Sequence, residues 1–277
     1  MLQPIAHDTM EDAYALLARG FPMRTSDFWK EGLLRQSQFH IAQDLGPVGQ
    51  LLWVKGEPVG VILTMRSRRG GDAARTVVNL SSWYVDDRYR LLAPRMLQQV
   101  LAEPSSTFTD LTPSPPVTAM MERFGFVRRH DGGLIIPLPL AALRPGAGGA
   151  IAGVDAADIG ADARRLLDDH LTFGCLVCFL RAEGADQPLV FSTARRKGLP
   201  TARLIYATDV AAVHRNLGPI ARFLLRNGAI CLELPAKRDE AVFGGWFSQR
   251  SRPTFVRGDA VTAEVDHAYS EFVFLRI

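Results

Sequence analysis

A strand joined by a short charged turn to a helix is the feature that most constrains the fold of this sequence. Residues 76–101 read TVVNLSSWYVDDRYRLLAPRMLQQVL. The apolar, β-branched run that ends at Val85 predicts a strand buried on both faces. The apolar spacing from Leu91 to Leu101 predicts an amphipathic helix, and Pro94 suits its first turn. Because a helix N-terminus carries free N–H groups and a partial positive charge, this connection predicts an anion-binding site.

Capping residues and glycines divide the rest of the first half into elements. The run Thr9-Met10-Glu11-Asp12 is typical of a capping box, and Gly125 is placed as a helix C-cap. Before the strand and helix described above, the predicted elements are an extended start at 3–6, helices from 10 to about 18 and from about 26, strands at 51–54 and 58–65, and a polar turn at 66–75. After them we predict a strand at 108–111 and a helix from 115 to about 124. Strands at 126–129 and 134–138 follow, joined by the turn signal HDGG.

The segment around Val85 resembles motif A of the GNAT acyltransferases, which bind acyl-CoA. In that family a strand ends in a valine, a charged loop follows, and an Arg/Gln-x-x-Gly-x-Gly/Ala loop holds the CoA pyrophosphate on backbone N–H groups. Val85 matches the valine and Arg90 the loop arginine, whereas Ala93 and Arg95 stand at the two small residues. Residues 120–126, MMERFGF, resemble the family's Leu-Tyr-Glu-Lys-Leu-Gly-Phe. The resemblance covers about residues 1–139, but the glycines that let backbone approach phosphate are absent.

The resemblance implies a site for the co-substrate at this connection. Ala93 is small enough for close approach, and an arginine can contact phosphate through its side chain. An ordinary strand-to-helix connection with solvated charges is the alternative. Ser114 stands where the family often has an asparagine that contacts the cofactor, although a plain helix N-cap is the interpretation we prefer. The residues assigned to acyl-CoA binding are Val85, Arg90, Leu91, Leu92, Ala93, Pro94, Arg95 and Ser114.

Candidates for the chemistry lie on the same strand. Tyr84 and Ser82 are the candidate catalytic residues, since substrates meet near this strand in the family. Tyr84 could serve as an acid and Asp86 as a base through water. The alternative is that Tyr84 is a core residue and Asp86 an ordinary loop acid. Met121 stands where many GNAT enzymes have a tyrosine that protonates the leaving thiolate, and methionine cannot donate a proton. That acid is therefore absent or is supplied by another group.

The second half of the chain repeats the order of the first. When Arg215 is aligned with Arg90, Gly218 falls on Ala93 and Val210 on Val85. The expected elements are a helix at 155–170, strands at 176–180, 189–193 and 203–210, a helix at 216–225, strands at 229–234 and 254–257, and a closing strand at 271–277. We therefore predict an α/β fold (α+β in some schemes) with two tandem GNAT-like domains, each a mixed, mostly antiparallel sheet flanked by helices. The predicted boundaries are 1–143 and 154–277, with the Gly- and Ala-rich stretch 144–153 as a linker.

Composition narrows the classes of partner. Lysine and arginine total 32 against 29 acids, and a net charge of +3 does not indicate a nucleic-acid partner. No apolar run approaches the roughly 20 residues of a membrane span, and the start lacks the pattern of a signal peptide. Three cysteines cannot form a disulfide framework. Cys175 and Cys178 lie in a strand-like run, where a redox or metal role is not expected. We expect a cytoplasmic protein with no membrane partner and no metal.

The expected function is an acyl-CoA-dependent N-acyltransferase, with acetyl-CoA or another acyl-CoA as co-substrate. The acceptor would be the amine of a small molecule or a protein, and a homodimer is compatible with this interpretation. A non-catalytic GNAT-like protein that binds a ligand or partner is the alternative. An aminoacyl-tRNA-dependent transferase of the Fem type is a third hypothesis, for which a basic groove would be needed.

Overall fold

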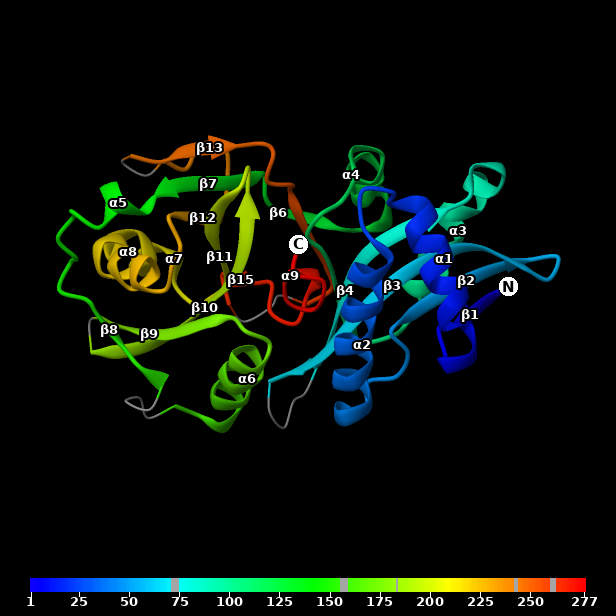
Figure 1. Cartoon of the computed structure of the whole chain (residues 1–277), viewed down its shortest axis with the longest axis horizontal. Helices are drawn as coiled ribbons and strands as arrows, with labels where there is room; N and C mark the ends of the chain where they lie inside the picture. Colours follow the sequence, from blue (N-terminus) through cyan, green and yellow to red (C-terminus); the bar gives the residue numbers. More distant parts are fainter. Residues whose placement is uncertain (71–74, 155–158, 183, 242–243, 260–262) are drawn as a thin grey trace. The chain divides into compact units, whose positions relative to one another are not determined.

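The chain folds into two compact units, each built on a mixed sheet (Figure 1). A computed structural model describes residues 1–277 except 71–74, 155–158, 183, 242–243 and 260–262. The first unit comprises Met1–Val127, Phe255–Asp259 and Tyr269–Leu275. The second comprises Arg128–Thr254, Ala260–Ala268 and Arg276–Ile277.

The first unit is built on a seven-stranded sheet, whose central pair, β4 and β5, is parallel. Residues 128–130, in the edge strand β6 of this sheet, are counted with the second unit. In spatial order the strands are β1 (Leu2–Pro4), β2 (Gly49–Val54), β3 (Glu57–Arg69), β4 (Arg75–Val85), β5 (Ser106–Asp110), β14 (Thr254–Arg257) and β6 (Val127–His130). The helices are η1 (His7–Thr9), α1 (Met10–Gly20), α2 (Ser26–Gln43), η3 (Asp87–Leu92), α3 (Ala93–Val100), α4 (Pro115–Met121), η4 (Glu122–Phe124) and α9 (Glu271–Phe274).

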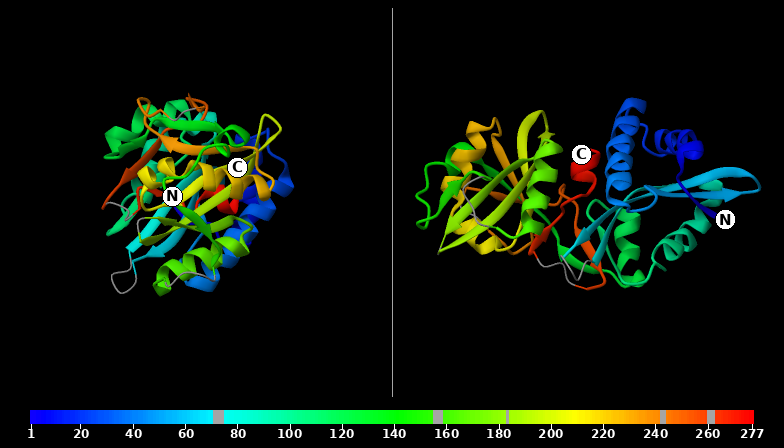
Figure 2. Two further views of the ribbon diagram at one scale, coloured as in Figure 1. Left: turned by 90° about the vertical axis from the view of Figure 1, so that its left-hand side faces the viewer. Right: turned by 90° about the horizontal axis from the view of Figure 1, so that it is seen from below.

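Helices cover both faces of this first sheet. In the right-hand view of Figure 2, α1 and α2 (blue) lie on one face, and α3 and α4 lie on the other. Met96 and Leu97 of α3 are buried against Val78 and Phe108 of the central strands. Thr25 caps α2, because its side chain accepts a hydrogen bond from the Phe28 N–H at 3.2 Å. The buried apolar face of α3 thus fixes where that helix begins relative to the end of β4.

The second unit repeats the arrangement with eight strands in one sheet. In spatial order these are β13 (Trp246–Ser248), β7 (Gly132–Pro137), β12 (Cys231–Ala236), β11 (Leu199–Ala207), β10 (Ala185–Arg196), β9 (Leu176–Ala182) and β8 (Ala150–Ala152), and β15 (Val265–Asp266) pairs with β11. The helices are α5 (Leu138–Ala141), α6 (Ala161–Thr172), α7 (Val210–Arg215) and α8 (Leu217–Arg226). The parallel pair β11–β12 corresponds to β4–β5 of the first unit.

Each sheet contains a strand from the other half of the sequence. β14 lies between β5 and β6, and β7 lies between β12 and β13. Consequently β6 and β7 do not form the hairpin that HDGG indicates. Gly132 and Gly133 permit close packing instead, since a Cβ on either would come within 2.8 Å of Ser248 or Ser251. The chain passes from the first unit to the second after Val127, before β7 and α5, and not in the Gly-rich stretch 144–153.

Four segments differ from the sequence prediction. The helix expected at 155–170 is α6, Ala161–Thr172, and residues 155–158 of that prediction lie outside the described part of the chain. The closing strand expected at 271–277 is instead the helix α9, which begins at a Ser270 cap whose Oγ accepts from the Phe272 N–H at 3.3 Å. The turn expected at 66–75 is shorter, because β3 continues to Arg69 and pairs with the start of β4. The strand expected to reach Val210 ends at Ala207, since Asp209 caps α7 by accepting from the Ala212 N–H at 2.7 Å.

Candidate active site

The two central strands of the first unit separate part-way along β4. The parallel pairing of β4 with β5 runs only from Thr76 to Leu80, whereas β4 continues to Val85. At the point of separation Ser82 has a φ of 51°, and the register with β3 shifts. An extra residue of this kind bends a strand away from its neighbour. The edge of β4 beyond Leu80 therefore faces no described strand, and an extended chain with amide groups can pair with such an edge.

A pocket of about 390 Å³ lies at the end of this separated segment. It is lined by Trp83, Tyr84, Val85, Arg90, Ala93, Pro94, Ser114, Pro116, Val117 and Met120. The structure thus gathers six of the predicted site residues into one cavity, namely Tyr84, Val85, Arg90, Ala93, Pro94 and Ser114. These residues come from the end of β4, the following helical segment and the start of α4, so the fold of one unit is enough to assemble the pocket.

The remaining predicted residues lie outside the pocket lining. The side chain of Leu91 is 95% exposed, and Arg95 is exposed as well. Leu92 is half-buried against the core, and Ser82 lies with its hydroxyl 3.2 Å from that of Ser81. Because Leu91 and Arg95 point to solvent, neither side chain obstructs the beginning of α3.

The connection between β4 and α3 is a 3₁₀ helix, η3, and not an open loop. The Tyr89 N–H donates to the Asp86 carbonyl at 2.8 Å, and the Ala93 N–H donates to the Arg90 carbonyl. These amides are used within the helix, so the predicted cradle of free N–H groups at the start of α3 does not form at Ala93. The chain winds into a helical turn because it lacks the glycines that would hold an open loop. Positive charge here comes from the side chain of Arg90, which pairs with Asp87.

Tyr84, which lines the pocket, is held by a charged network with Asp86 and Arg19. Its hydroxyl donates to Asp86 Oδ1 at 2.8 Å, and Asp86 accepts from Arg19 Nη1 at 2.8 Å. The Tyr84 ring lies against Gly20, where an added Cβ would come within 2.4 Å of the ring. Burial and the bond to Asp86 raise the pKa of Tyr84 above its ordinary value. Tyr84 is therefore an oriented, protonated phenol, and Asp86 is engaged in holding it.

Two neighbouring methionines at the end of α4 differ in their surroundings. Met121, at the position of the family's tyrosine, is 1% exposed and belongs to the hydrophobic core. Its neighbour Met120 lines the pocket instead. Ser114 occupies the N-cap position of α4, but its side chain makes no capping hydrogen bond. The Ser114 hydroxyl is thus available to a ligand, contrary to the simple capping role preferred from the sequence.

The corresponding edge in the second unit is occupied by the chain itself. β11 pairs with β12 only from Thr201 to Arg203, and β15 pairs with Tyr206 and Ala207. Tyr206 is already paired on its other side with β10, so β15 takes the edge that faces β12. The His267 N–H also donates to the Ile205 carbonyl at 2.7 Å. A ligand strand therefore has no free edge at this place in the second unit.

The beginning of α8, which corresponds to the beginning of α3, is covered as well. An added Cβ on Gly218 would lie 2.0 Å from the Arg144 carbonyl oxygen. Arg222 Nη1 donates to that same oxygen at 3.2 Å, and Asn216 Oδ1 accepts from the Gly149 N–H at 3.0 Å. The glycine that this half retains thus accommodates the segment 144–149 and not a phosphate. No residue pattern in 144–149 or 265–267 indicates this occupation beforehand.

Comparisons with known proteins identify the fold. No family model matches the sequence. No curated protein matches it either. A GCN5-related N-acetyltransferase from Anabaena variabilis superposes with a TM-score of 0.57 at 11% identity, over 93% of this chain and 72% of the other. A GCN5-related N-acetyltransferase from Kribbella flavida superposes with a TM-score of 0.52 at 12% identity, over 92% of this chain and 70% of the other.

The chain has the GNAT fold in two tandem copies. At these identities the likeness establishes architecture, and it confirms the predicted fold class of two mixed, mostly antiparallel sheets flanked by helices. In the described part of the chain, no helix combines the length and apolar character of a membrane span. No cluster of three or more His, Cys, Asp or Glu side chains is placed to hold a metal ion among the described residues.

Proposed function

We propose that the first GNAT unit is an acyl-CoA-dependent N-acyltransferase that moves an acyl group, with acetyl as the first candidate, to an amine. The observation that carries this proposal is the open edge of β4 beyond the bulge at Ser82, with a pocket at its end. Structural neighbours of nearly the whole chain are N-acetyltransferases by name, which supports the choice of reaction class. The second unit, whose corresponding edge is filled, contributes no second site of this kind.

The lining residues suit the two parts of an acyl-CoA. Arg90 and the Ser114 hydroxyl would contact the diphosphate, since a guanidinium binds phosphate through charge-assisted hydrogen bonds. The amide-bearing arm would extend along β4, past the apolar side chains of Val85 and Val117. Trp83 Nε1 is buried and has no partner among the described residues, so an acceptor on the ligand would satisfy it.

The chemistry is a direct attack of the amine nitrogen on the thioester carbonyl. The C–N bond forms, the C–S bond breaks, the amine proton passes to solvent and the departing thiolate takes a proton. We assign Tyr84 as the donor of that proton, because Tyr84 lines the pocket and its phenol is protonated and held by Asp86. Backbone N–H groups at the Ser82 bulge would stabilise the oxyanion, since preformed donors aimed at developing charge lower the barrier.

A thermal melt with acetyl-CoA and longer acyl-CoAs tests binding. A ligand at about a hundred times its dissociation constant adds about 2.7 kcal/mol of stability. We expect a rise in melting temperature that Arg90→Ala reduces and Arg215→Ala, at the aligned position of the second unit, leaves unchanged. No rise with any acyl-CoA would eliminate the transferase proposal.

A non-catalytic ligand-binding protein is the alternative, and two observations favour it. Met121 lies in the core where the family has its acid, and the amide of Ala93 is used within η3. Turnover of acetyl-CoA with a panel of small-molecule and peptide amines separates the two functions. A melting shift without thiol release from any of these amines would support the alternative.

A further inference from the structure

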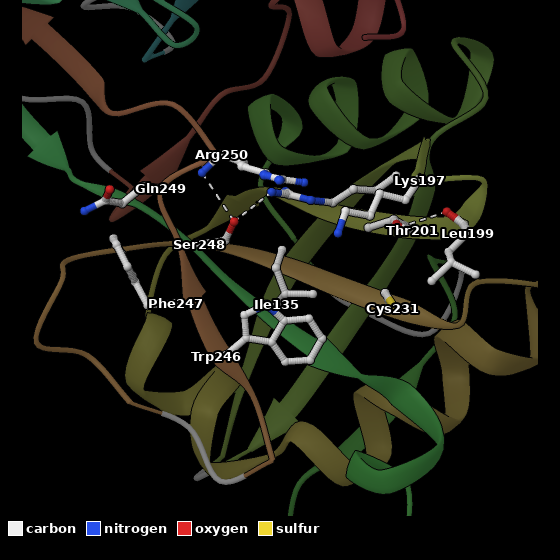
Figure 3. Close-up of a pocket in the computed structure, with 11 residues that line it drawn as sticks. Ile135, Lys197, Leu199, Thr201, Cys231, Trp246, Phe247, Ser248, Gln249 and Arg250 are labelled. Atoms are coloured by element: carbon white, nitrogen blue, oxygen red, sulfur yellow. Dashed lines mark hydrogen bonds between the residues drawn. The ribbon is translucent and has the colours of Figure 1, made fainter.

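A second pocket, of about 530 Å³, lies in the second unit and takes no part in the proposed acyl transfer. It is bounded by the turn between β10 and β11, by the starts of β11 and β12, and by β13 with the residues that follow it. Figure 3 shows Arg250 and Lys197 along one side of this cavity and Trp246 beside Ile135 on the other. All the lining residues belong to the range 128–254, so the pocket is formed by one unit.

The cavity carries an excess of positive charge. Arg196, Lys197 and Arg250 line it, and no lining residue is acidic. Beneath it the buried Glu233 carboxylate pairs with Arg196 at 2.9 Å and with Arg203 at 3.2 Å. Burial alone would raise the pKa of Glu233, but Arg203, Ser251 and Arg196 together lower it, so the group is ionised. Glu233 accepts from both guanidinium groups, and Arg203 Nη1 also donates to the Ile277 oxygen at 2.8 Å. The positive charge left for an anion is therefore that of Lys197 and Arg250.

Arg196 is held in place before any ligand arrives. Its Nη1 donates to Ser251 Oγ at 2.9 Å and its Nη2 to Ser248 Oγ at 3.0 Å. With the Glu233 pair these bonds fix the plane of the guanidinium at the base of the cavity. A fixed guanidinium loses little conformational freedom on binding an anion, so its charge-assisted bonds contribute more to affinity.

An exposed indole stands beside these cations. Trp246 lies on β13, paired with Ile135, and its side chain is 54% exposed. The exposed face of this indole, beside the cations, offers a stacking surface to a flat ring. Three cations in one cavity favour a phosphate monoester, which carries nearly two negative charges at neutral pH, over a single carboxylate.

We propose that this pocket binds a phosphate monoester that carries a flat heteroaromatic ring, as a mononucleotide does. The phosphate contacts Arg196, Lys197 and Arg250, and the ring stacks on Trp246. A cavity of this volume is large enough for a ligand of that size. The inference rests on the second unit alone, so it stands or falls separately from acyl transfer in the first.

Cys231 provides a reporter inside the pocket. It lines the cavity and is partly exposed, whereas Cys175 and Cys178 are buried. Burial raises the pKa of both buried thiols to about 12, which makes them poor nucleophiles. The rate of alkylation of Cys231 by iodoacetamide at mildly alkaline pH therefore measures occupancy of the cavity. The probes are AMP, adenosine and inorganic phosphate, each titrated against the full-length chain.

We expect AMP to slow alkylation at lower concentration than adenosine or phosphate alone. The double variant Lys197→Ala with Arg250→Ala should weaken the AMP effect by about tenfold or more, because it removes two of the charge-assisted contacts to the phosphate. Trp246→Ala should weaken the protection of Cys231 by AMP and leave its protection by inorganic phosphate unchanged. Lys237→Ala, which removes a cation outside the lining, is the matched control.

Two results would overturn the proposal. One is no protection by millimolar AMP, and the other is equal protection in the wild-type chain and the double variant. Arg90→Ala separates this site from the first one, because it should reduce the melting shift with acetyl-CoA and leave protection of Cys231 by AMP intact. Thermal melts of every variant establish that it is folded.

Discussion

The two GNAT units differ most at the place where their central parallel strands separate. In the first unit β4 leaves β5 after Leu80, and no described strand takes the free edge. In the second unit β15 takes the corresponding edge of β11, and the backbone of Arg144 lies against Gly218 at the start of α8. The fold alone therefore does not determine whether a unit can bind a ligand strand, because a short segment of the same chain can fill the groove.

The comparison also shows that a glycine of the family's phosphate-binding loop can serve another purpose. The second unit retains the glycine at position 218, where the first unit has Ala93. From the sequence, this glycine leaves the second unit open as an alternative to the site predicted in the first unit. In the structure the glycine accommodates a carbonyl oxygen, and the pocket beside the corresponding strand-to-helix connection lies in the unit that lacks it. A retained glycine is thus a poor guide to which copy has an open helix start.

The strongest test of this comparison removes the Tyr84 hydroxyl. Tyr84→Phe should lower the turnover of acetyl-CoA by about 10²–10⁴-fold, the range typical of a lost general acid, while the melting shift with acetyl-CoA persists. Tyr206→Phe removes a hydroxyl from the central strand of the second unit and should leave turnover unchanged. Equal losses in both variants would contradict the assignment of chemistry to the first unit.

Acid should destabilise both units through buried histidines. His40 Nε2 accepts a hydrogen bond from the Arg66 N–H at 3.0 Å, and His40 Nδ1 contacts the Gly46 carbonyl oxygen. Protonation of Nε2 would break the hydrogen bond from Arg66. Burial lowers the pKa of His40 to about 4, and burial likewise lowers the pKa of His130 in the second unit to about 4. Below about pH 6.5 these histidines bind protons in the unfolded chain but not in the folded chain. The free energy of unfolding therefore falls as the pH falls from about 6.5 to about 4, by up to about 3 kcal/mol per histidine.

Urea unfolding across this pH range measures the effect. His40→Gln and His130→Gln should each lower stability at neutral pH and flatten the pH dependence. If only one of the two variants flattens it, that histidine accounts for the loss of stability in acid. A curve that stays equally steep in both variants would contradict the assignment of the pH dependence to these two histidines.

A methyl group at Gly218 should test the covered helix start. Gly218→Ala forces the new Cβ against the Arg144 carbonyl, and overpacking of this kind costs about 1–3 kcal/mol. Gly153→Ala, where nothing lies within 4 Å of the added Cβ, is the matched control and should change stability by less. The free energy of unfolding in urea gives both values. An unchanged stability in Gly218→Ala would show that segment 144–149 does not cover the helix.

A smaller effect is expected for the arginine in the pocket. Arg90→Ala should weaken acetyl-CoA binding by about tenfold, corresponding to about 1.4 kcal/mol, because Arg90 is exposed and partly engaged with Asp87. Arg215→Ala should not change it. Isothermal titration gives both dissociation constants, and a larger loss in Arg215→Ala would reverse the roles of the two units.

Much of the fold could be predicted from capping residues and periodicity. Thr9, Thr25 and Gly125 mark helix ends where the structure has them, and the apolar run to Val85 is a central strand. The exchange of β7 and β14 could not be predicted, because the alternation of a strand is the same whichever sheet receives it. The buried run Phe272–Phe274 fits a strand or a helix equally well, and the Ser270 cap decides for the helix.

The candidate site was predicted in part for a similar reason. Residues joined in sequence, such as Val85, Arg90 and Ala93, were found together because one strand-to-helix connection carries them. The sequence gives no sign that Leu91 points to solvent or that η3 uses its own amides. It also gives no sign of β15, since long-range pairing of a two-residue strand leaves no pattern.

Hydrogen exchange of backbone amides in the presence of acetyl-CoA tests the central claim most directly. The account predicts slower exchange at residues 81–85 and around Arg90 when acetyl-CoA is added, with no change at residues 203–218. Protection confined to residues 203–218, or no protection anywhere along β4, would contradict it.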